Sequence, residues 1–276
     1  MRAARAPRPR RRLGQHFLAD PAILARIADA LDPVPGETVL EIGPGRGSLT
    51  DVLLGRGVTV IAMEKDRALA AALGVRRAAW GAYQLSVVQG DALQQDWHAL
   101  VDARVDAPHA ARRAPHFKII GNIPYNITSP LIEKALTPPL PERVVFLVQR
   151  EVAERIAASP GSKTYGALSV GVQATCRVEL LFTVAPGAFR PPPRVRSALL
   201  RLTPLAEPLV AGAEVAALRR FVTACFSRRR KQLRNVVPGG GLTAADLEAL
   251  GFDPTARPET LPPAAFVRLL RGRRQL

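Results

Sequence analysis

A short apolar segment that runs directly into a glycine-rich turn places the strongest constraint on the fold of this chain. Residues 38–42 read Thr-Val-Leu-Glu-Ile, which is typical of a buried strand, and residues 43–47 read Gly-Pro-Gly-Arg-Gly. Glycines let the backbone approach a ligand closely, and a helix from about Ser48 would present free N–H groups beside it. The pattern predicts a strand, a turn and a helix that together bind a small molecule.

The same turn departs from the dinucleotide-binding fingerprint. That fingerprint has a third Gly or Ala at the position where this chain has Ser48. The sequence therefore does not favour a ligand with a pyrophosphate group. A nucleoside without phosphates, such as S-adenosyl-L-methionine, fits the turn better.

Four further apolar segments alternate with helical segments after the turn. Strands are expected at about 58–63, 85–88, 117–120 and 144–148. Strands that alternate with helices predict a parallel sheet and hence an α/β fold of the Rossmann-like kind. A chain of 276 residues exceeds a typical single domain, so a smaller second domain is expected.

Two acids follow the second and third strands at informative positions. Glu64 lies roughly 20 residues after the glycine turn, where a ribose diol is usually bound. Asp91 follows the third strand and could accept a hydrogen bond from an adenine amine. The alternatives are a solvated acid that opens the next helix for Glu64 and a helix N-cap for Asp91.

The tetrapeptide at the end of the fourth strand can seat an exocyclic amine. The Asn122 side-chain oxygen and the Ile123 carbonyl can both accept N–H hydrogen bonds and so localise the lone pair of an adenine N6. Pro124 stiffens the turn, and Tyr125 can stack on a flipped base. The alternative is an ordinary Asn-x-Pro turn after a strand.

Several motifs together carry a family resemblance. They lie at 14–18, 41–47, 64–66, 90–92, 121–127, 148–155, 165–166, 189–195 and 226–231. With these motifs in this order, the chain resembles the ribosomal RNA adenine N6-methyltransferases, nearest to the bacterial 16S rRNA adenine dimethyltransferases. The resemblance spans most of the chain and implies a Rossmann-like class I S-adenosylmethionine-dependent methyltransferase with a small C-terminal helical domain. It also implies an antiparallel edge pair of strands near 168–178 and 195–202.

The resemblance also implies which residues form the site. The expected cofactor-binding residues are His16, Leu18, Glu41, Gly43, Gly45, Glu64, Asp91, Ala92 and Asn122. The expected catalytic residues are Asn122, Ile123, Pro124, Tyr125 and Phe189, of which Phe189 would pack against the flipped adenine. The family more often has Asn at position 16, so a contact from His16 could differ in geometry or pH sensitivity. It commonly has Leu at position 123, but only the backbone carbonyl is used there, so Ile123 should be harmless.

Charge is consistent with an RNA substrate. The chain has 39 Lys and Arg against 23 Asp and Glu, a formal net charge of +16, which attracts polyanions. The residues expected to bind RNA are Arg228, Arg229, Arg230, Lys231 and Arg234. A merely solvated helix face is the alternative for this run, and incidental charge is the alternative for the Arg-rich start.

The expected domains are a basic, disordered tail at 1–12, a methyltransferase domain at 13–204 and a helical RNA-binding domain at 205–276. Within the last, helices are expected at 215–233 and 243–250.

Composition limits the remaining classes. Four His and two Cys show no metal-ligand spacing and no disulfide framework, so no metal is expected. No secretory segment or long apolar span is present, which predicts a cytoplasmic protein. A monomer is expected as well. An organellar transit peptide is the alternative for the Arg-rich start, although Pro7 and Pro9 would interrupt its helix.

Three functions remain open at this point. The first is dimethylation of N6 in two adjacent adenosines of the 3′-terminal hairpin loop of 16S rRNA, in a small-subunit assembly intermediate. The second is methylation of 23S rRNA adenine, which confers macrolide resistance. The third is a nucleic-acid-binding assembly or transcription factor on the same fold.

Overall fold

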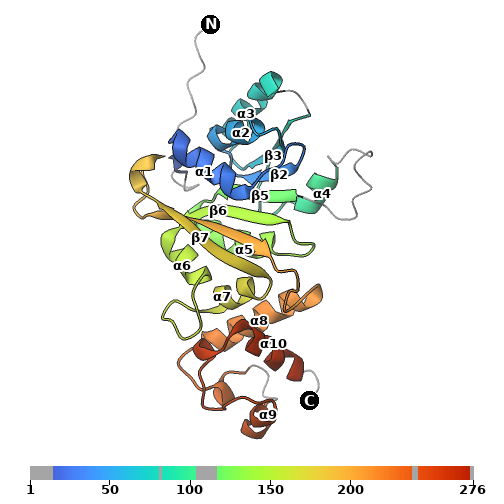
Figure 1. The fold of residues 1–276 in the computed structure, drawn as a ribbon, viewed down its shortest axis with the longest axis vertical. Helices are drawn as coiled ribbons and strands as arrows, with labels where there is room; N and C mark the ends of the chain where they lie inside the picture. Colours follow the sequence, from blue (N-terminus) through green and yellow to red (C-terminus); the bar gives the residue numbers. More distant parts are fainter. Residues whose placement is uncertain (1–14, 81–82, 104–116, 238–241, 274–276) are drawn as a thin grey trace. The chain divides into compact units, whose positions relative to one another are not determined.

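A central sheet of seven strands organises the first compact unit of the chain. The computed structural model of the protein describes residues 15–80, 83–103, 117–237 and 242–273, and the predicted tail at 1–12 lies outside them. The strand order is β4-β3-β2-β5-β6-β9-β7 (Figure 1). The strands are β2 (Thr38–Ile42), β3 (Thr59–Glu64), β4 (Leu85–Gln89), β5 (Phe117–Asn122), β6 (Arg143–Gln149), β7 (Cys176–Val184) and β9 (Ser197–Pro204).

The parallel part of the sheet agrees with the sequence-based prediction. Strand β2 pairs in parallel with β3 and β5, β3 with β4, and β5 with β6, whereas β9 pairs antiparallel with β6. The five strands expected from apolar segments are confirmed, as is a strand near 195–202.

The strand expected near 168–178 is wrong over its first half. Residues Ala167–Gln173 form the helix α7, and β7 begins only at Cys176. Ser169 Oγ accepts the Gly166 N–H at 3.1 Å and donates to the Arg155 carbonyl at 2.5 Å. Gln173 Nε2 also donates to two carbonyls of the preceding segment. These side-chain hydrogen bonds stabilise a helix where the resemblance implied a strand.

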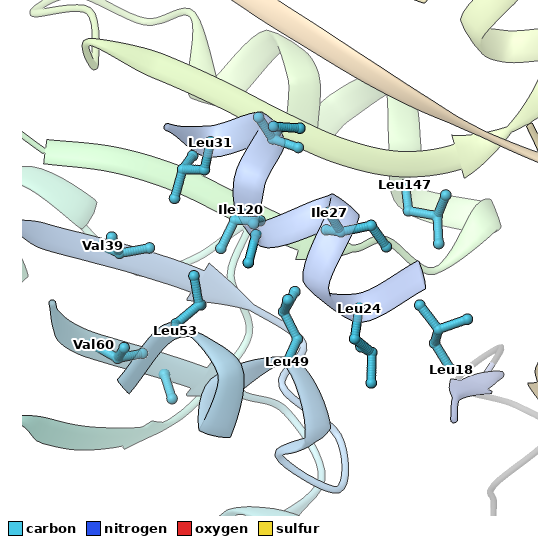
Figure 2. Packing of buried hydrophobic residues seen from close by; sticks show 14 of the residues in the cluster. Leu18, Leu24, Ile27, Leu31, Val39, Leu49, Leu53, Val60, Ile120 and Leu147 are labelled. Atoms are coloured by element: carbon cyan, nitrogen blue, oxygen red, sulfur yellow. The ribbon is translucent and has the colours of Figure 1, made fainter. Parts of the chain in front are cut away.

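Helices α1 (Pro21–Leu31) and α2 (Ser48–Leu54) cover the parallel strands near the glycine turn. Asp20 caps α1 by accepting the N–H groups of residues 22 and 23, and Pro21 occupies the first turn. Figure 2 shows Leu24, Ile27 and Leu31 projecting from α1 into the buried cluster, at the spacing of one helix face. This packing fixes the start of α2 beside the sheet.

A second, two-stranded sheet holds the N-terminal segment. Strand β1 (Phe17–Leu18) pairs antiparallel with β8 (Phe189–Arg190). Leu18 and Phe189 are both buried in the main core. The pairing ties two segments that are far apart in the sequence.

The chain folds into two compact units. The first comprises 1–135, 139–150 and 179–203, and the second comprises 136–138, 151–178 and 204–276. The second unit has its own core, with Tyr165, Phe221 and Phe266 among its buried side chains. The functional division at residue 204 stays a prediction, since a compact core does not say which part binds RNA.

The remaining helices are α3 (Arg67–Trp80), α4 (Trp97–Asp102), α5 (Thr128–Ala135), α6 (Arg150–Ile156), α8 (Ala213–Ser227), α9 (Ala244–Ala249) and α10 (Pro263–Gly272). The helix expected at 215–233 is therefore too long. Ser227 Oγ donates to the Ala224 carbonyl at 2.7 Å, Arg228 leaves the helical region, and the Lys231 N–H closes a turn on the Arg228 carbonyl. Helix α9 agrees with the expected 243–250, and α10 was not foreseen.

Candidate active site

A cavity of about 170 Å³ opens at the carboxyl ends of the parallel strands. Strands β2 and β5 are neighbours there. The chain continues from β2 to β3 on one side of this pair and from β5 to β6 on the other side. Open α/β sheets bind ligands at such a switch point. The predicted residues that line the cavity are His16, Leu18, Glu41, Gly43, Gly45, Glu64, Asp91, Ala92, Asn122, Ile123, Pro124 and Tyr125. The structure thus brings every residue predicted to bind the cofactor to one cavity.

The glycine turn after β2 adopts a backbone that favours glycine. Gly43, Gly45 and Gly47 have φ values of +69°, +58° and +79°. A Cβ on Gly45 would also lie 2.9 Å from the ring of Phe17. The turn therefore needs glycine for both its conformation and the close approach of the N-terminal segment.

Glu64, at the end of β3, is held as a fixed acceptor. Its Oε2 accepts the Gly45 N–H at 3.0 Å and its Oε1 accepts the Asp66 N–H at 2.8 Å. Burial raises the pKa of Glu64, while these backbone hydrogen bonds lower it in part. Each carboxylate oxygen retains a lone pair, so Glu64 can accept further hydroxyl donors from the cavity side.

Glu41 lies deeper, under the glycine turn, and is 1% exposed. Thr50 Oγ1 donates to its Oε2 at 2.6 Å. Burial raises the pKa of Glu41 to about 8, against the opposing effect of the Thr50 hydrogen bond. The hydrogen bond from Thr50 ties the buried carboxyl group to the first turn of α2.

Asp91 lies in the turn after β4 and caps that turn rather than a helix, since the next helix, α4, begins at Trp97. Its Oδ1 accepts the Leu93 N–H at 3.0 Å, as an N-cap does, and its Oδ2 accepts from Lys65 Nζ at 2.7 Å. The hydrogen bond from Lys65 is the main cause that lowers the pKa of Asp91. The carboxylate is ionised, lines the cavity and can accept an amine donor there.

The Asn122 side chain has a defined orientation. Its Nδ2 donates to the His16 carbonyl at 2.7 Å. A carbonyl can only accept, so the amide nitrogen must face His16 and the side-chain oxygen is the acceptor that remains for a ligand. This is the orientation that the amine-binding hypothesis requires.

The rest of the tetrapeptide is fixed by backbone and side-chain contacts. The Ile123 N–H donates to the Leu147 carbonyl at 3.0 Å, and Ile123 is one of the residues that line the cavity. Pro124 has a φ of −56°. The Tyr125 hydroxyl hydrogen-bonds with Ser197 Oγ at 2.8 Å, and burial raises the pKa of Tyr125. The aromatic ring therefore stands at the cavity with its hydroxyl anchored.

Phe189 is the one predicted catalytic residue that the structure does not bring to the cavity. Its side chain is fully buried in the main core, in the strand that pairs with Leu18. A contact between Phe189 and a base would require a rearrangement of β1 and β8. The predicted role of Phe189 stays a prediction.

The predicted RNA-binding segment lies in the second unit, in the turn after α8. The exposed side chains in it are Arg228, Arg230, Lys231 and Arg234. Arg229 differs, because its Nε donates to Glu259 at 2.6 Å and its Nη2 to the Ser162 carbonyl at 3.3 Å. The segment therefore offers exposed cations around one arginine that supports the local structure.

Several cavity residues were missed by the sequence reasoning. Phe17, Arg46 and Lys65 lie within the motifs of the resemblance and line the cavity, but no role was predicted for them. The Arg46 guanidinium lies 4.7 Å from the centre of the Phe17 ring. Ser197 holds the Tyr125 hydroxyl from β9. Nothing local in the sequence marks Ser197, since its contact depends on the pairing of β9 with β6.

The described residues also bear on metal ions and membranes. Within the ranges that the structure describes, no group of three or more His, Cys, Asp or Glu is arranged to hold a metal ion. Among the described helices, none has the length and apolar character that a membrane span requires.

Comparison with known proteins identifies the family. The family model described as ribosomal RNA adenine dimethylase matches residues 7–269. The chain is 44% identical to ribosomal RNA small subunit methyltransferase A of Pseudomonas aeruginosa, over 95% of this chain and 93% of that protein. It is also 44% identical to the protein of the same name from Acidithiobacillus ferrooxidans, over 95% of this chain and 94% of that protein.

Solved structures agree on the fold. A dimethyladenosine transferase from Plasmodium falciparum is 28% identical with a TM-score of 0.78, covering 94% of this chain and 98% of that one. The 23S rRNA methyltransferase ErmE is also 28% identical, with a TM-score of 0.66, covering 94% of this chain and 100% of that one. The predicted Rossmann-like methyltransferase fold is confirmed. This chain belongs to the ribosomal RNA adenine dimethylase family.

Proposed function

We propose that this enzyme uses S-adenosyl-L-methionine to dimethylate N6 of two adjacent adenosines in the 3′-terminal hairpin loop of 16S rRNA. Its substrate would be a small-subunit assembly intermediate. The observation that carries the proposal is the orientation of Asn122, whose amide nitrogen is bound to the His16 carbonyl and whose oxygen is left to accept. The names of the relatives at 44% identity support the small subunit as the target.

The donor set of the cavity fits S-adenosyl-L-methionine. Glu64 is fixed between two backbone N–H groups, at the position suited to a ribose diol, and Asp91 is an ionised acceptor suited to the adenine amine. The glycine turn suits close approach of the backbone to a ligand, because Gly43 lines the cavity and has no side chain in the way. When bound, this cofactor supplies an electrophilic methyl group on a sulfonium.

The acceptor half of the site prepares the adenine N6 for attack. The lone pair of N6 is delocalised into the ring, so it must be localised before it can attack a methyl group. Asn122 Oδ1 and the Ile123 carbonyl each accept a hydrogen bond from one of the two N6–H groups. These hydrogen bonds draw the nitrogen toward tetrahedral geometry. Tyr125 holds the base by stacking, with its hydroxyl tied to Ser197. Positioning and exclusion of water supply most of the acceleration.

The proton leaves after the methyl group has arrived. The attacking nitrogen gains positive charge during transfer, so its N–H becomes acidic and can be lost to water without a dedicated base. For the second methylation, one of the two acceptor oxygens loses its N–H partner. The other must then hold the amine, which predicts a slower second step when Asn122 is altered.

The RNA partner would be held by exposed cations of the second unit. Arg228, Arg230, Lys231 and Arg234 are exposed and can contact phosphates. Contacts to phosphates set affinity and register, whereas the extruded adenine is read in the cavity. We further propose that the protein acts as a monomer, and its predicted cytoplasmic location stays a prediction.

The proposal is tested by methyl transfer from labelled S-adenosyl-L-methionine to purified under-methylated small subunits and, separately, to naked 23S rRNA. The modified nucleoside is identified by mass spectrometry. Dimethyladenosine in small subunits alone is the expected result. Label in 23S rRNA would assign the protein to the resistance function instead, and no label in either RNA would favour a binding factor on the same fold.

A further inference from the structure

Residues 15–18, which we call the strap, form part of the cavity wall and contact Asn122 and Tyr125. The strap lines the cavity along its length. Its far end is fixed, because Leu18 is buried and β1 pairs with β8. Within the strap, His16 contacts Asn122 and Tyr125 of the tetrapeptide 122–125. It also contacts Pro191, which follows β8.

The first contact uses the main chain of His16. Its carbonyl accepts the Asn122 Nδ2–H at 2.7 Å. If the amide of Asn122 rotated by half a turn, two oxygens would face each other, so this carbonyl fixes the acceptor orientation of Asn122. Any residue at position 16 has a carbonyl, but the carbonyl acts only while the strap stays in place.

The other two contacts use the ring of His16. Nδ1 lies 2.8 Å from the Pro191 carbonyl, so Nδ1 must carry the proton and donate it. The ring also stacks against Tyr125, with centroids 5.8 Å apart and planes at 29°. His16 therefore packs against one face of Tyr125.

We infer that His16 is a positioning residue of the acceptor site. It holds the Asn122 oxygen and the Tyr125 ring in the geometry that the target amine needs, and its side chain is anchored to Pro191 rather than used as a cofactor ligand. The inference rests on the proposed function, because the acceptor amine is the one assigned there. By this inference, both the strap and the tetrapeptide 122–125 determine the specificity of the site for the target amine.

Two substitutions separate the contacts of the ring. His16→Asn keeps a donor at the position of Nδ1 and removes the ring, whereas His16→Phe keeps a ring and removes the donor. His98→Phe is a matched control, because His98 Nε2 also bonds to a carbonyl, that of Pro139 at 2.7 Å, and the ring also contacts an aromatic residue, outside the cavity lining.

For His16→Phe we expect kcat to fall about tenfold, the equivalent of one hydrogen bond, with KM for the methyl donor unchanged. His16→Asn should restore kcat to within about threefold of the unaltered enzyme, since only the stacking on Tyr125 is removed. His98→Phe should change neither constant. Binding of S-adenosylhomocysteine, measured by calorimetry, should stay within about twofold in all three variants.

Hydrogen exchange of the segment 122–127 gives a readout that needs no catalysis. In this segment the Ile127 N–H donates to the Pro124 carbonyl at 3.1 Å, and we expect faster exchange there in His16→Phe than in His98→Phe. Equal exchange in the two variants would overturn the inference, as would a loss of S-adenosylhomocysteine affinity that matches the loss of kcat. If the unaltered enzyme transfers no methyl group, the proposed function fails, and the exchange comparison still decides whether His16 holds the turn.

Discussion

The cavity of the first unit and the basic segment of the second unit, residues 228–234, differ in how firmly they hold their polar groups. In the cavity, Glu64 is fixed by two backbone hydrogen bonds and Asn122 by one, and Glu41 is almost fully buried. In the basic segment, Arg228 and Arg230 are exposed to solvent. Reaction chemistry requires groups held in one geometry, whereas attraction to a polyanion requires only charge within reach.

The largest expected effect is the loss of transfer in Asn122→Ala. The substitution removes the oxygen that localises the N6 lone pair, and removal of one preorganised polar group of this kind lowers kcat by about 100-fold to 1,000-fold. Binding of S-adenosylhomocysteine should stay largely intact. Asn126→Ala alters the exposed neighbour in the same turn and serves as the control. Near-normal turnover in Asn122→Ala would remove the chemical role assigned to the cavity.

The next largest effect concerns RNA binding. Replacing Arg228, Arg230 and Lys231 together with Ala should weaken binding and flatten its salt dependence. The slope of log K against log salt should fall by roughly 0.7 to 0.9 for each phosphate that the protein no longer neutralises. Filter binding across a series of salt concentrations measures it.

A charge-matched control uses three other exposed cations of the same unit. The triple variant of Lys163, Arg220 and Arg257 to Ala removes the same charge elsewhere. Its salt slope should stay close to that of the unaltered protein. If both triple variants flatten the slope equally, the basic segment contributes general charge and is not a distinct RNA-binding surface.

A third expected effect is a pH dependence of stability that arises from the cavity. Burial raises the pKa of Glu41 to about 8 from an unfolded value near 4.5. A raised carboxyl pKa favours the neutral form in the folded state, so its contribution to stability decreases as pH rises from about 5 to 8. Glu41→Gln keeps an acceptor for Thr50 and cannot ionise. Urea midpoints measured across this range should fall less steeply in Glu41→Gln, and parallel curves would contradict the buried neutral form.

The smallest expected effect distinguishes Arg229 from its neighbours. Arg229 pairs with Glu259 with side chains 36% and 25% exposed, so solvent screening limits the pair to about 1 kcal/mol or less. Arg229→Ala should lower the melting temperature by about 2 to 4 °C. Arg228→Ala, one position away, should leave it unchanged. A shift of equal size in both variants would mean that the pair adds nothing specific.

The parts of the site that follow directly from local sequence were predictable. The glycine turn and Asp91 come just after strands of the parallel sheet, and Glu64 and Asn122 are the last residues of two others. Such strand ends meet at one edge of the sheet. Contacts that depend on distant pairing were not predictable. Ser197 reaches Tyr125 only because β9 pairs with β6, and the local sequence carries no signal for that pairing.

The errors in the fold have similar causes. The resemblance implied a strand near 168–178, but side-chain hydrogen bonds from Ser169 and Gln173 to the preceding segment stabilise a helix over its first half. The helix at 213–227 ended before the basic segment, because Ser227 and Arg228 close a turn. In both places polar side-chain contacts decide the local structure.

The most direct test of the division between the two regions is the single-turnover rate of methyl transfer at saturating RNA. It is measured for Asn122→Ala and for the triple variant of Arg228, Arg230 and Lys231. The account predicts that Asn122→Ala loses the rate even when RNA is fully bound, whereas the triple variant recovers it once the RNA concentration is raised. Comparable losses at saturation in both variants would contradict the assignment of chemistry to the cavity and of affinity to the basic segment.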